Sequence, residues 1–254
     1  MSVTFEVRGR CAILTINRPE ARNAVNAAVA AAIEVGIDRI EADDDLWVGI
    51  LTGTRPAFCA GADLKEVQAG TVGGLFTERG GFGGFAARQR TKPFIAAVDG
   101  PALAGGTELV LAADLVVATG RSTFGIPEVK RSLVAGAGGL FRLPRKIPEN
   151  VAMECALTGD SIPAARAAHF GLVNELVEDD GAVDAALALA ERIIANGPLA
   201  VRESRRVVLA STHLNDDEAF ALSREAMGTV AGSADLREGV AAFIEKRPPR
   251  WTGR

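Results

Sequence analysis

Two glutamates stand in segments whose composition suggests chemistry. Glu108 lies within residues 99–114 (DGPALAGGTELVLAAD), where almost every neighbour is apolar or small. A carboxylate buried among such residues responds by raising its pKa, and a carboxyl that titrates nearer neutrality suits proton transfer. A structural, hydrogen-bonded Glu108 would show the same pattern, so composition alone leaves both interpretations open.

The second glutamate, Glu128, follows a proline within residues 122–139 (STFGIPEVKRSLVAGAGG), a stretch too irregular for an amphipathic helix. Taken alone, such a residue is more often a solvated loop carboxylate. Gly136, Gly138 and Gly139 then supply backbone that another group can approach closely. The interest of Glu128 therefore comes from its combination with the neighbouring motifs.

Two glycine-containing turns could expose main-chain N–H groups. In residues 58–67 (FCAGADLKEV), Gly61 permits a tight turn, and the small residue after it leaves its N–H open to a ligand oxygen. Gly105 stands at the equivalent place before the helix that carries Glu108. The alternative for the first segment is a plain strand-to-helix turn with Asp63 near the helix N-terminus. Two such N–H groups and two carboxyls suit reaction at an activated carbonyl, because they hold a developing oxyanion and move protons.

Length and charge limit what the protein can be. With 254 residues, 48% of them hydrophobic, the chain can bury a core without disulfides or metals. A net charge of −4 argues against nucleic acid as the main partner. Three scattered cysteines and two distant histidines form no metal or triad pattern, so we expect no metal. The absence of a long apolar stretch or a signal-peptide pattern predicts a cytoplasmic protein without membrane contacts.

Hydrophobic periodicity predicts an α/β protein. The expected order is a hairpin, a helix capped by Asn26 and three buried strands, over residues 4–16, 26–41, 47–52, 94–98 and 115–118. From Gly181 onward the pattern is wholly helical. Residues 70–84 contain seven glycines, which predicts a mobile loop rather than a packed element.

Taken in order, these segments resemble the crotonase (enoyl-CoA hydratase/isomerase) family. The match runs from Asn17-Arg18-Pro19 and Asn23-Ala24 to the final Phe243-Ile244-Glu245-Lys246-Arg247, and so covers essentially the whole chain. The resemblance implies a crotonase-like (ClpP/crotonase) spiral of repeated ββα units over residues 1–195, which holds the acyl-CoA site. It also implies a C-terminal helical trimerisation segment over residues 196–254, with assembly into a homotrimer or a hexamer made of two trimers.

The resemblance also implies roles for individual residues. The N–H groups of Ala62 and Gly105 would form an oxyanion hole for the thioester oxygen. Glu108 and Glu128 match the two hydratase glutamates, and the N–H of Gly136 would help to hold the water. Because both glutamates are retained, the expected reaction is reversible syn addition of water to a 2-enoyl-CoA thioester. Coenzyme A is then part of the substrate, and no separate cofactor is expected.

Coenzyme A contacts are implied at Arg22, Ala60, Ala62, Asp63, Leu64, Lys65, Gly105 and Lys246, the last through the nucleotide phosphates, in its own or a neighbouring subunit. The chain departs from the family pattern at Glu20, where many hydratases have lysine and where Arg22 is the nearby cation. It departs again at Ala104, which replaces the first glycine of a frequent triplet, and at Arg131-Ser132, which replaces a common Leu-Gly pair.

Other functions within and outside the family stay open. Residues 80–85, Phe141-Arg142-Leu143-Pro144 and the C-terminal Trp251 resemble the carnitine branch, which would make the protein a crotonobetainyl-CoA hydratase (carnitinyl-CoA dehydratase). An enoyl-CoA isomerase would use only one carboxyl. A non-catalytic acyl-CoA-binding protein is the alternative of another class, since a fold does not determine function. The sequence does not specify the acyl group.

Overall fold

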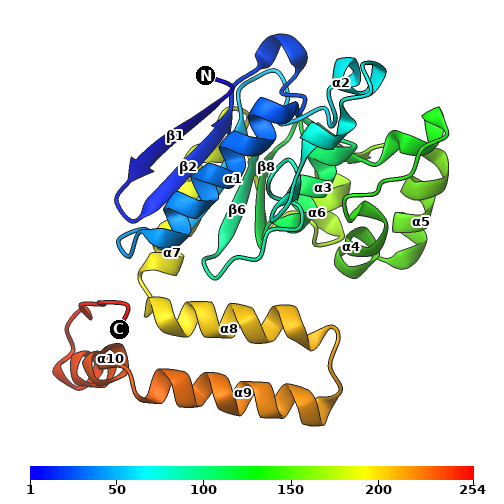
Figure 1. Cartoon of the computed structure of the whole chain (residues 1–254). Helices are drawn as coiled ribbons and strands as arrows, with labels where there is room; N and C mark the ends of the chain where they lie inside the picture. Colours follow the sequence, from blue (N-terminus) through cyan, green and yellow to red (C-terminus); the bar gives the residue numbers. More distant parts are fainter.

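The computed structural model describes residues 1–254 (Figure 1). The strands are β1 (Val3–Arg8), β2 (Cys11–Ile16), β3 (Val48–Gly53), β4 (Phe76–Thr77), β5 (Gly81–Phe82), β6 (Phe94–Val98), β7 (Pro101–Leu103), β8 (Leu115–Thr119), β9 (Thr123–Gly125), β10 (Ile162–Pro163) and β11 (Glu175–Val177). The α-helices are α1 (Ala27–Ala42), α2 (Leu64–Gln68), α3 (Gly105–Ala112), α4 (Gly139–Lys146), α5 (Glu149–Thr158), α6 (Ala164–His169), α7 (Ala182–Ile194), α8 (Pro198–Ser211), α9 (Asp216–Ala231) and α10 (Ala234–Glu245). Three short 3₁₀ helices, η1 (Pro19–Ala21), η2 (Val72–Leu75) and η3 (Pro127–Arg131), lie in the connections.

The central sheet has six strands in the order β1-β2-β3-β6-β8-β11. The predicted hairpin is confirmed as the antiparallel pair β1 and β2, and the remaining pairs are parallel. The predicted cap of the first helix is confirmed too, because the Asn26 side chain accepts a hydrogen bond of 3.0 Å from the Val29 N–H.

A second, smaller sheet makes the fold a spiral. It contains β7, β9 and β10, and an isolated bridge between Cys59 and Ala102 extends it towards the segment that follows β3. Each full turn of the chain therefore places one strand in the large sheet and the next in the small sheet before a helix follows, as in β6, β7 and α3. The predicted α/β fold of repeated ββα units is confirmed.

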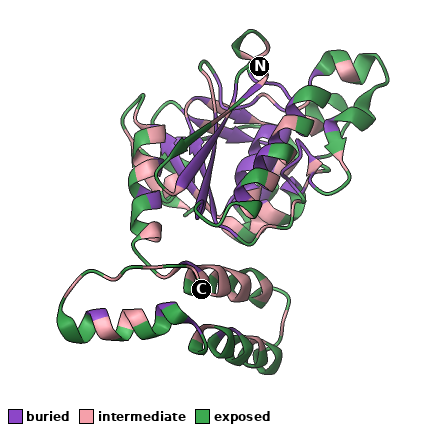
Figure 2. Cartoon of the chain, turned by 60° about the vertical axis from the view of Figure 1, so that its left-hand side comes forward, coloured by how far each residue is buried: buried purple, intermediate pink, exposed green.

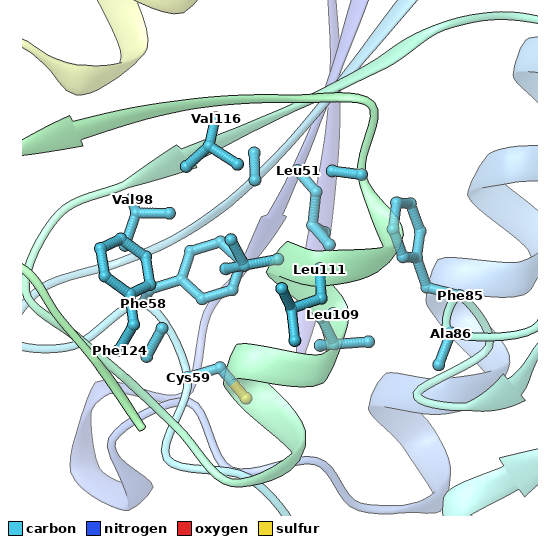
Figure 3. Packing of buried hydrophobic residues seen from close by; sticks show 14 of the residues in the cluster. Leu51, Phe58, Cys59, Phe85, Ala86, Val98, Leu109, Leu111, Val116 and Phe124 are labelled. Atoms are coloured by element: carbon cyan, nitrogen blue, oxygen red, sulfur yellow. The ribbon is translucent and has the colours of Figure 1, made fainter. Parts of the chain in front are cut away.

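The core fills both faces of the central sheet, because successive side chains of a strand point to opposite sides. The main cluster of 41 buried residues lies on the face covered by α1 and α3, so this face supports the site. A smaller cluster of 12 residues faces α7. Figure 3 shows Phe58, Val98 and Phe124 on one side of α3 and Phe85 on the other, so the helix is wedged into apolar packing along its length.

The prediction that residues 70–84 are not a packed element is wrong for residues 75–84, whereas residues 70–74 are exposed. The predicted mobility of the segment stays a prediction. η2 and the small hairpin β4–β5 occupy this segment, and Leu75 and Phe82 belong to the main core. The glycines allow close backbone approach: a Cβ on Gly84 would overlap the carbonyl oxygen of Ala30 in α1. Residues 75–84 thus form a packed cover beside α1.

Polar contacts hold the same hairpin to α1. The Thr77 hydroxyl donates to the Glu34 carboxylate over 2.5 Å. Arg79 pairs with Asp38 over 2.6 Å and with Glu34 over 3.3 Å. These contacts fix the strand that carries Phe82, whose ring lies at the start of α3.

The last three helices leave the core as an arm. Figure 2 shows α9 and α10 largely exposed and α8 mostly half-buried, in contrast to the buried central sheet. Arg205 of α8 attaches the arm to the core, since its Nε lies 2.9 Å from Asp114 Oδ2 and its Nη1 donates to the Arg90 carbonyl. The predicted division into residues 1–195 and 196–254 stays a prediction. None of the helices has the length and apolar character that crossing a membrane requires.

Candidate active site

Two turns of the spiral bring the Ala62 and Gly105 main chains together. The Cys59–Ala102 bridge aligns them, and the Leu103 N–H donates to the Cys59 carbonyl over 2.9 Å. Gly61 has a φ of +92°, and a Cβ on it would lie only 3.1 Å from the Gly105 nitrogen. The Ala62 N–H makes no hydrogen bond within the chain. The Gly105 N–H opens α3, where the first N–H groups have no partner within the helix.

The turn before α3 is built for close approach. Ala104 has φ 52° and ψ −128°, a conformation rarely adopted by a residue with a Cβ. A Cβ on Gly105 would overlap the ring of Phe82, which therefore lies directly against this main chain. The N-terminus of α3 is thus enclosed by the hairpin on one side and faces the Gly61 turn on the other.

Glu108 is fully enclosed in the first turn of α3, with 3% of its surface exposed. Its Oε1 accepts hydrogen bonds from the Ala137 N–H over 2.7 Å and the Gly139 N–H over 2.9 Å. Burial raises the pKa of Glu108 above its ordinary value, although these two hydrogen bonds and the charge of Arg142 oppose the rise. Both hydrogen bonds therefore tie the Oε1 atom of Glu108 to the turn before α4.

Glu128 lies in η3 and is only partly buried, yet its Oε2 is inaccessible and has no hydrogen-bond partner within the protein. Burial raises the pKa of Glu128, and the negative charge of Glu108 raises it further. The two carboxyls are therefore close enough to interact electrostatically. An unsatisfied buried carboxyl oxygen is costly unless water or a ligand completes it.

Sequence reasoning missed the two residues that hold Glu108. It singled out Gly136, whose N–H makes no hydrogen bond within the chain, but did not assign a function to Ala137 or Gly139. The available signal was the glycine run that precedes the helix. Such a run indicates that another group packs closely against this backbone, but it does not identify that group as the Glu108 carboxyl.

The residues expected to contact coenzyme A cluster around α2. The Ala60 N–H donates to the Arg22 carbonyl over 3.0 Å, so these two positions adjoin. Leu64 and Lys65 are exposed at the start of α2 and are free to meet a ligand.

Asp63 belongs to the same cluster but has a structural task. Its carboxylate pairs with Arg18 over 2.9 Å and caps α2 by accepting from the Lys65 N–H over 3.1 Å. Burial acts to raise the pKa of Asp63, but this hydrogen bond and the Arg18 charge outweigh it, so the pKa is lowered. Its side chain is therefore occupied. Its main chain is occupied too, because the N–H donates to the Val25 carbonyl over 2.8 Å and the carbonyl accepts from the Glu66 N–H over 3.0 Å.

Lys246 is not brought to this cluster within one chain. It ends α10 in a left-handed conformation and is exposed. Figure 1 places α10 at the opposite end of the molecule from α2. Nowhere in the chain do three His, Cys, Asp or Glu side chains gather as metal ligands would.

A ββα spiral with two neighbouring carboxyls beside two turns of open main chain is the architecture of the crotonase class of enzymes. The enoyl-CoA hydratase/isomerase family profile matches residues 6–254, and the chain belongs to this family.

Individual relatives agree with this assignment. Enoyl-CoA hydratase EchA19 of Mycobacterium tuberculosis is 41% identical over 98% of this chain and 96% of its own. The crystal structure of enoyl-CoA hydratase EchA1 from Mycobacterium marinum has a TM-score of 0.96 and 54% identity, covering 100% of this chain and 99% of that one. The crystal structure of carnitinyl-CoA hydratase from Mycobacterium avium has a TM-score of 0.78 and 43% identity, with the same coverage. The predicted family is confirmed, and these names agree with the predicted hydro-lyase class.

Proposed function

We propose that the protein is an enoyl-CoA hydratase in which Glu108 and Glu128 together add water to a 2-enoyl-CoA thioester. The single observation that carries the proposal is the asymmetric carboxyl pair. One carboxyl is held by two main-chain N–H groups, whereas the other has a buried oxygen without a partner. The names of the relatives supply the substrate class.

In this proposal the thioester oxygen lies between the N–H groups of Ala62 and Gly105. Both are main-chain donors in neighbouring turns, and neither needs to give up a hydrogen bond from regular structure. As water adds, negative charge develops on this oxygen, and donors already in place stabilise it without reorganising. The Phe82 ring behind Gly105 keeps bulk water from that side.

The carboxyls then divide the proton work. Glu108 is the ionised partner, because two N–H donors favour the charged form. Glu128 acts in its protonated form in this proposal, a form that burial and the charge of Glu108 favour by raising its pKa. The water oxygen bonds to the β-carbon while Glu108 accepts one of its protons, and Glu128 gives its proton to the α-carbon. Proton transfer from Glu108 to Glu128 restores the starting state. The resemblance to the hydratases of this family implies that the addition is syn.

Glutamine substitutions test this mechanism. Glu108→Gln and Glu128→Gln each keep size and hydrogen bonding but remove proton transfer, so each should lower kcat by roughly 10²-fold or more. The double variant should be little worse than the more damaging single, because residues acting as a unit are not additive. Steady-state kinetics with crotonyl-CoA, followed by loss of the conjugated thioester chromophore, gives these values.

The control is Glu149→Gln, which changes an exposed glutamate in the first turn of α5. Its kcat should stay within about twofold, as expected for a surface substitution. Thioester affinity by calorimetry should survive in every variant, because the oxyanion donors are main-chain groups. Near-wild-type hydration by Glu128→Gln would refute the two-glutamate mechanism. One silent substitution would favour an isomerase, and binding without turnover in the wild type would favour a non-catalytic acyl-CoA-binding protein.

A second candidate follows from the likeness to carnitinyl-CoA hydratase from Mycobacterium avium, at 43% identity. The same glutamate pair would then hydrate crotonobetainyl-CoA, whose acyl group carries a quaternary ammonium. Side-by-side kcat/KM values for crotonobetainyl-CoA and crotonyl-CoA separate the two substrates.

The coenzyme A moiety would lie along α2, against Arg22, Lys65 and the main chain of residues 60–64. Lys246 of a neighbouring copy would reach the nucleotide phosphates, because within one chain it lies far from α2. The protein would therefore work as a homotrimer, or as a hexamer of two trimers, in the cytoplasm. Main-chain donors and carboxyls supply the chemistry, so we expect no metal or redox cofactor, and dialysis against a chelator should leave activity unchanged.

A further inference from the structure

Arg142 folds back over the start of its own helix, α4. Its Nη1 donates to the Ala137 carbonyl over 3.1 Å. Gly138, between them, has a φ of +115°, and a Cβ on it would overlap the Arg142 Nη1. The guanidinium therefore occupies the space that a side chain at position 138 would fill.

The Ala137 carbonyl belongs to the peptide that links the two donors to Glu108. The Ala137 N–H precedes this peptide and the Gly139 N–H follows it, and both reach the same carboxyl oxygen, Oε1 of Glu108. Glycine restrains a peptide poorly, because it has many accessible conformations. The hydrogen bond from Arg142 supplies the missing restraint.

We propose that Arg142 is a positioning residue for Glu108: by holding the Ala137 carbonyl, it fixes the two N–H groups that orient the carboxyl. Its kinetic consequence rests on the proposed hydratase function, whereas its effect on the Glu108 carboxyl does not. The side-chain hydrogen bond of Arg142 goes to the Ala137 carbonyl, and none goes to Ala62, Gly105 or α2. Its loss should therefore affect turnover more than substrate binding.

Charge gives the proposal a second readout. The charged side chains that face Glu108 are Glu128 from η3 and Arg142 from α4. Burial raises the pKa of Glu108, and the Arg142 charge is among the factors that oppose this rise. Removing the guanidinium leaves burial less opposed, so the pKa of Glu108 rises further. Because Glu108 works in its ionised form, the acidic limb of the kcat profile should move to higher pH.

The experiment compares Arg142→Gln and Arg142→Lys across pH with crotonyl-CoA. For Arg142→Gln we expect kcat to fall by roughly 10- to 100-fold, the scale of a misplaced catalytic group, with KM changed by less than about threefold. Its acidic limb should move up by about one pH unit. Arg142→Lys keeps the charge and should leave the limb near the wild-type position with a smaller loss of kcat.

Arg145→Gln is the matched control on the same helix. Its guanidinium lies over the Phe141 ring and 3.4 Å from His213 Nε2, and it has no hydrogen bond with residues 137–139. This variant should lose the same charge from α4 without shifting the limb. An equal shift in Arg145→Gln would overturn the proposal, because a general field effect would then explain it.

A substrate-free measurement separates this proposal from the proposed function. Carbon-13 NMR follows the Glu108 carboxyl through a titration, with the resonance assigned by its loss in Glu108→Gln. A higher carboxyl pKa in Arg142→Gln, but not in Arg145→Gln, supports positioning even if the wild type hydrates no enoyl-CoA. An unmoved carboxyl pKa in a folded Arg142→Gln protein sinks it, whatever the activity. If Arg142→Gln fails to fold, Arg142→Lys decides. A Glu108 titration curve like that of the wild type, together with a reduced kcat, supports the proposal. An unchanged kcat in Arg142→Lys contradicts it.

Discussion

Ala104 joins the small sheet to the helix of Glu108 in a strained conformation. Its N–H donates to the Gly125 carbonyl over 2.8 Å, and its own carbonyl accepts from the Glu108 N–H over 3.2 Å. With φ 52° and ψ −128°, it holds a backbone shape that costs a non-glycine residue on the order of 1–3 kcal/mol. The surrounding hydrogen bonds keep it there, at the point where the Gly105 N–H is presented.

Ala104→Gly should therefore stabilise the protein. Relief of strain outweighs the roughly 0.4–1 kcal/mol that glycine costs by loosening the unfolded chain, so we expect a gain of about 1 kcal/mol. Urea unfolding at fixed protein concentration measures it. Ala31→Gly, on the exposed side of α1, is the control and should lose roughly 0.5–1 kcal/mol. A loss in Ala104→Gly as large as in Ala31→Gly would show that the turn is not strained.

At the scale of single residues, the sequence predicts which residues belong to the site better than it predicts their hydrogen-bond partners. The burial of Glu108 could be anticipated, because its apolar neighbours lie in the same helix. Its hydrogen-bond partners could not, since Ala137 and Gly139 are 29 and 31 residues away. The departure at Ala104 was visible as a missing glycine, but only the structure connects it to a positive φ.

The hairpin β4–β5 is packed although its many glycines predict a mobile loop. Many glycines usually indicate conformational freedom, which predicts a mobile loop for residues 70–84. Here Gly84 instead allows the chain to pass against the backbone of α1, while Phe82 and Leu75 supply the buried surface. A glycine can make the backbone flexible, or it can let the backbone pack closely against another segment. Which of the two applies depends on residues distant in sequence, so the local sequence pattern does not predict it. The helices and long strands were predictable because their signals are local.

Gly84→Ala tests the close approach. Gly84 has a φ of +67°, and a Cβ there would overlap the Ala30 carbonyl oxygen, so the hairpin must move away from α1. We expect the free energy of unfolding to fall by roughly 1–3 kcal/mol, as for overpacking in a core. Gly73→Ala is the control, because no atom lies within 4 Å of its Cβ position. Thermal unfolding of both variants should separate them, and equal melting temperatures would mean that the hairpin is not packed as described.

On the scale of the whole molecule, the arm of α8 to α10 leaves large apolar side chains in solvent. Phe243 is 86% exposed and Ile244 72%, with Met227 at 70% and Phe220 at 65%. The periodicity predicted these helices correctly, yet periodicity within one chain cannot reveal what covers their outer faces. Large apolar side chains exposed in such number on one arm usually mark a contact with another protein surface.

Light scattering on the purified protein should give three or six times the 26.4 kDa chain mass. Phe243→Glu should shift the assembly towards smaller species, because an uncompensated charge would be buried in the contact. Val35→Glu, at an exposed position of α1, should leave the mass unchanged. A monomeric wild type at micromolar concentration would contradict the proposed trimer.

The placement of Ala62 and Gly105 has a consequence for how the gene can vary. If their N–H groups form the oxyanion hole, no single side-chain truncation can delete a donor, since every residue except proline carries one. A deep mutational scan should therefore tolerate small residues at position 62 while rejecting proline there, and should reject nearly everything at position 105, where Phe82 leaves no room. Substitutions that accumulate during evolution would then occur mostly at the carboxyl residues and in the walls of the pocket. A lineage could exchange one thioester reaction for another while the donor pair persists.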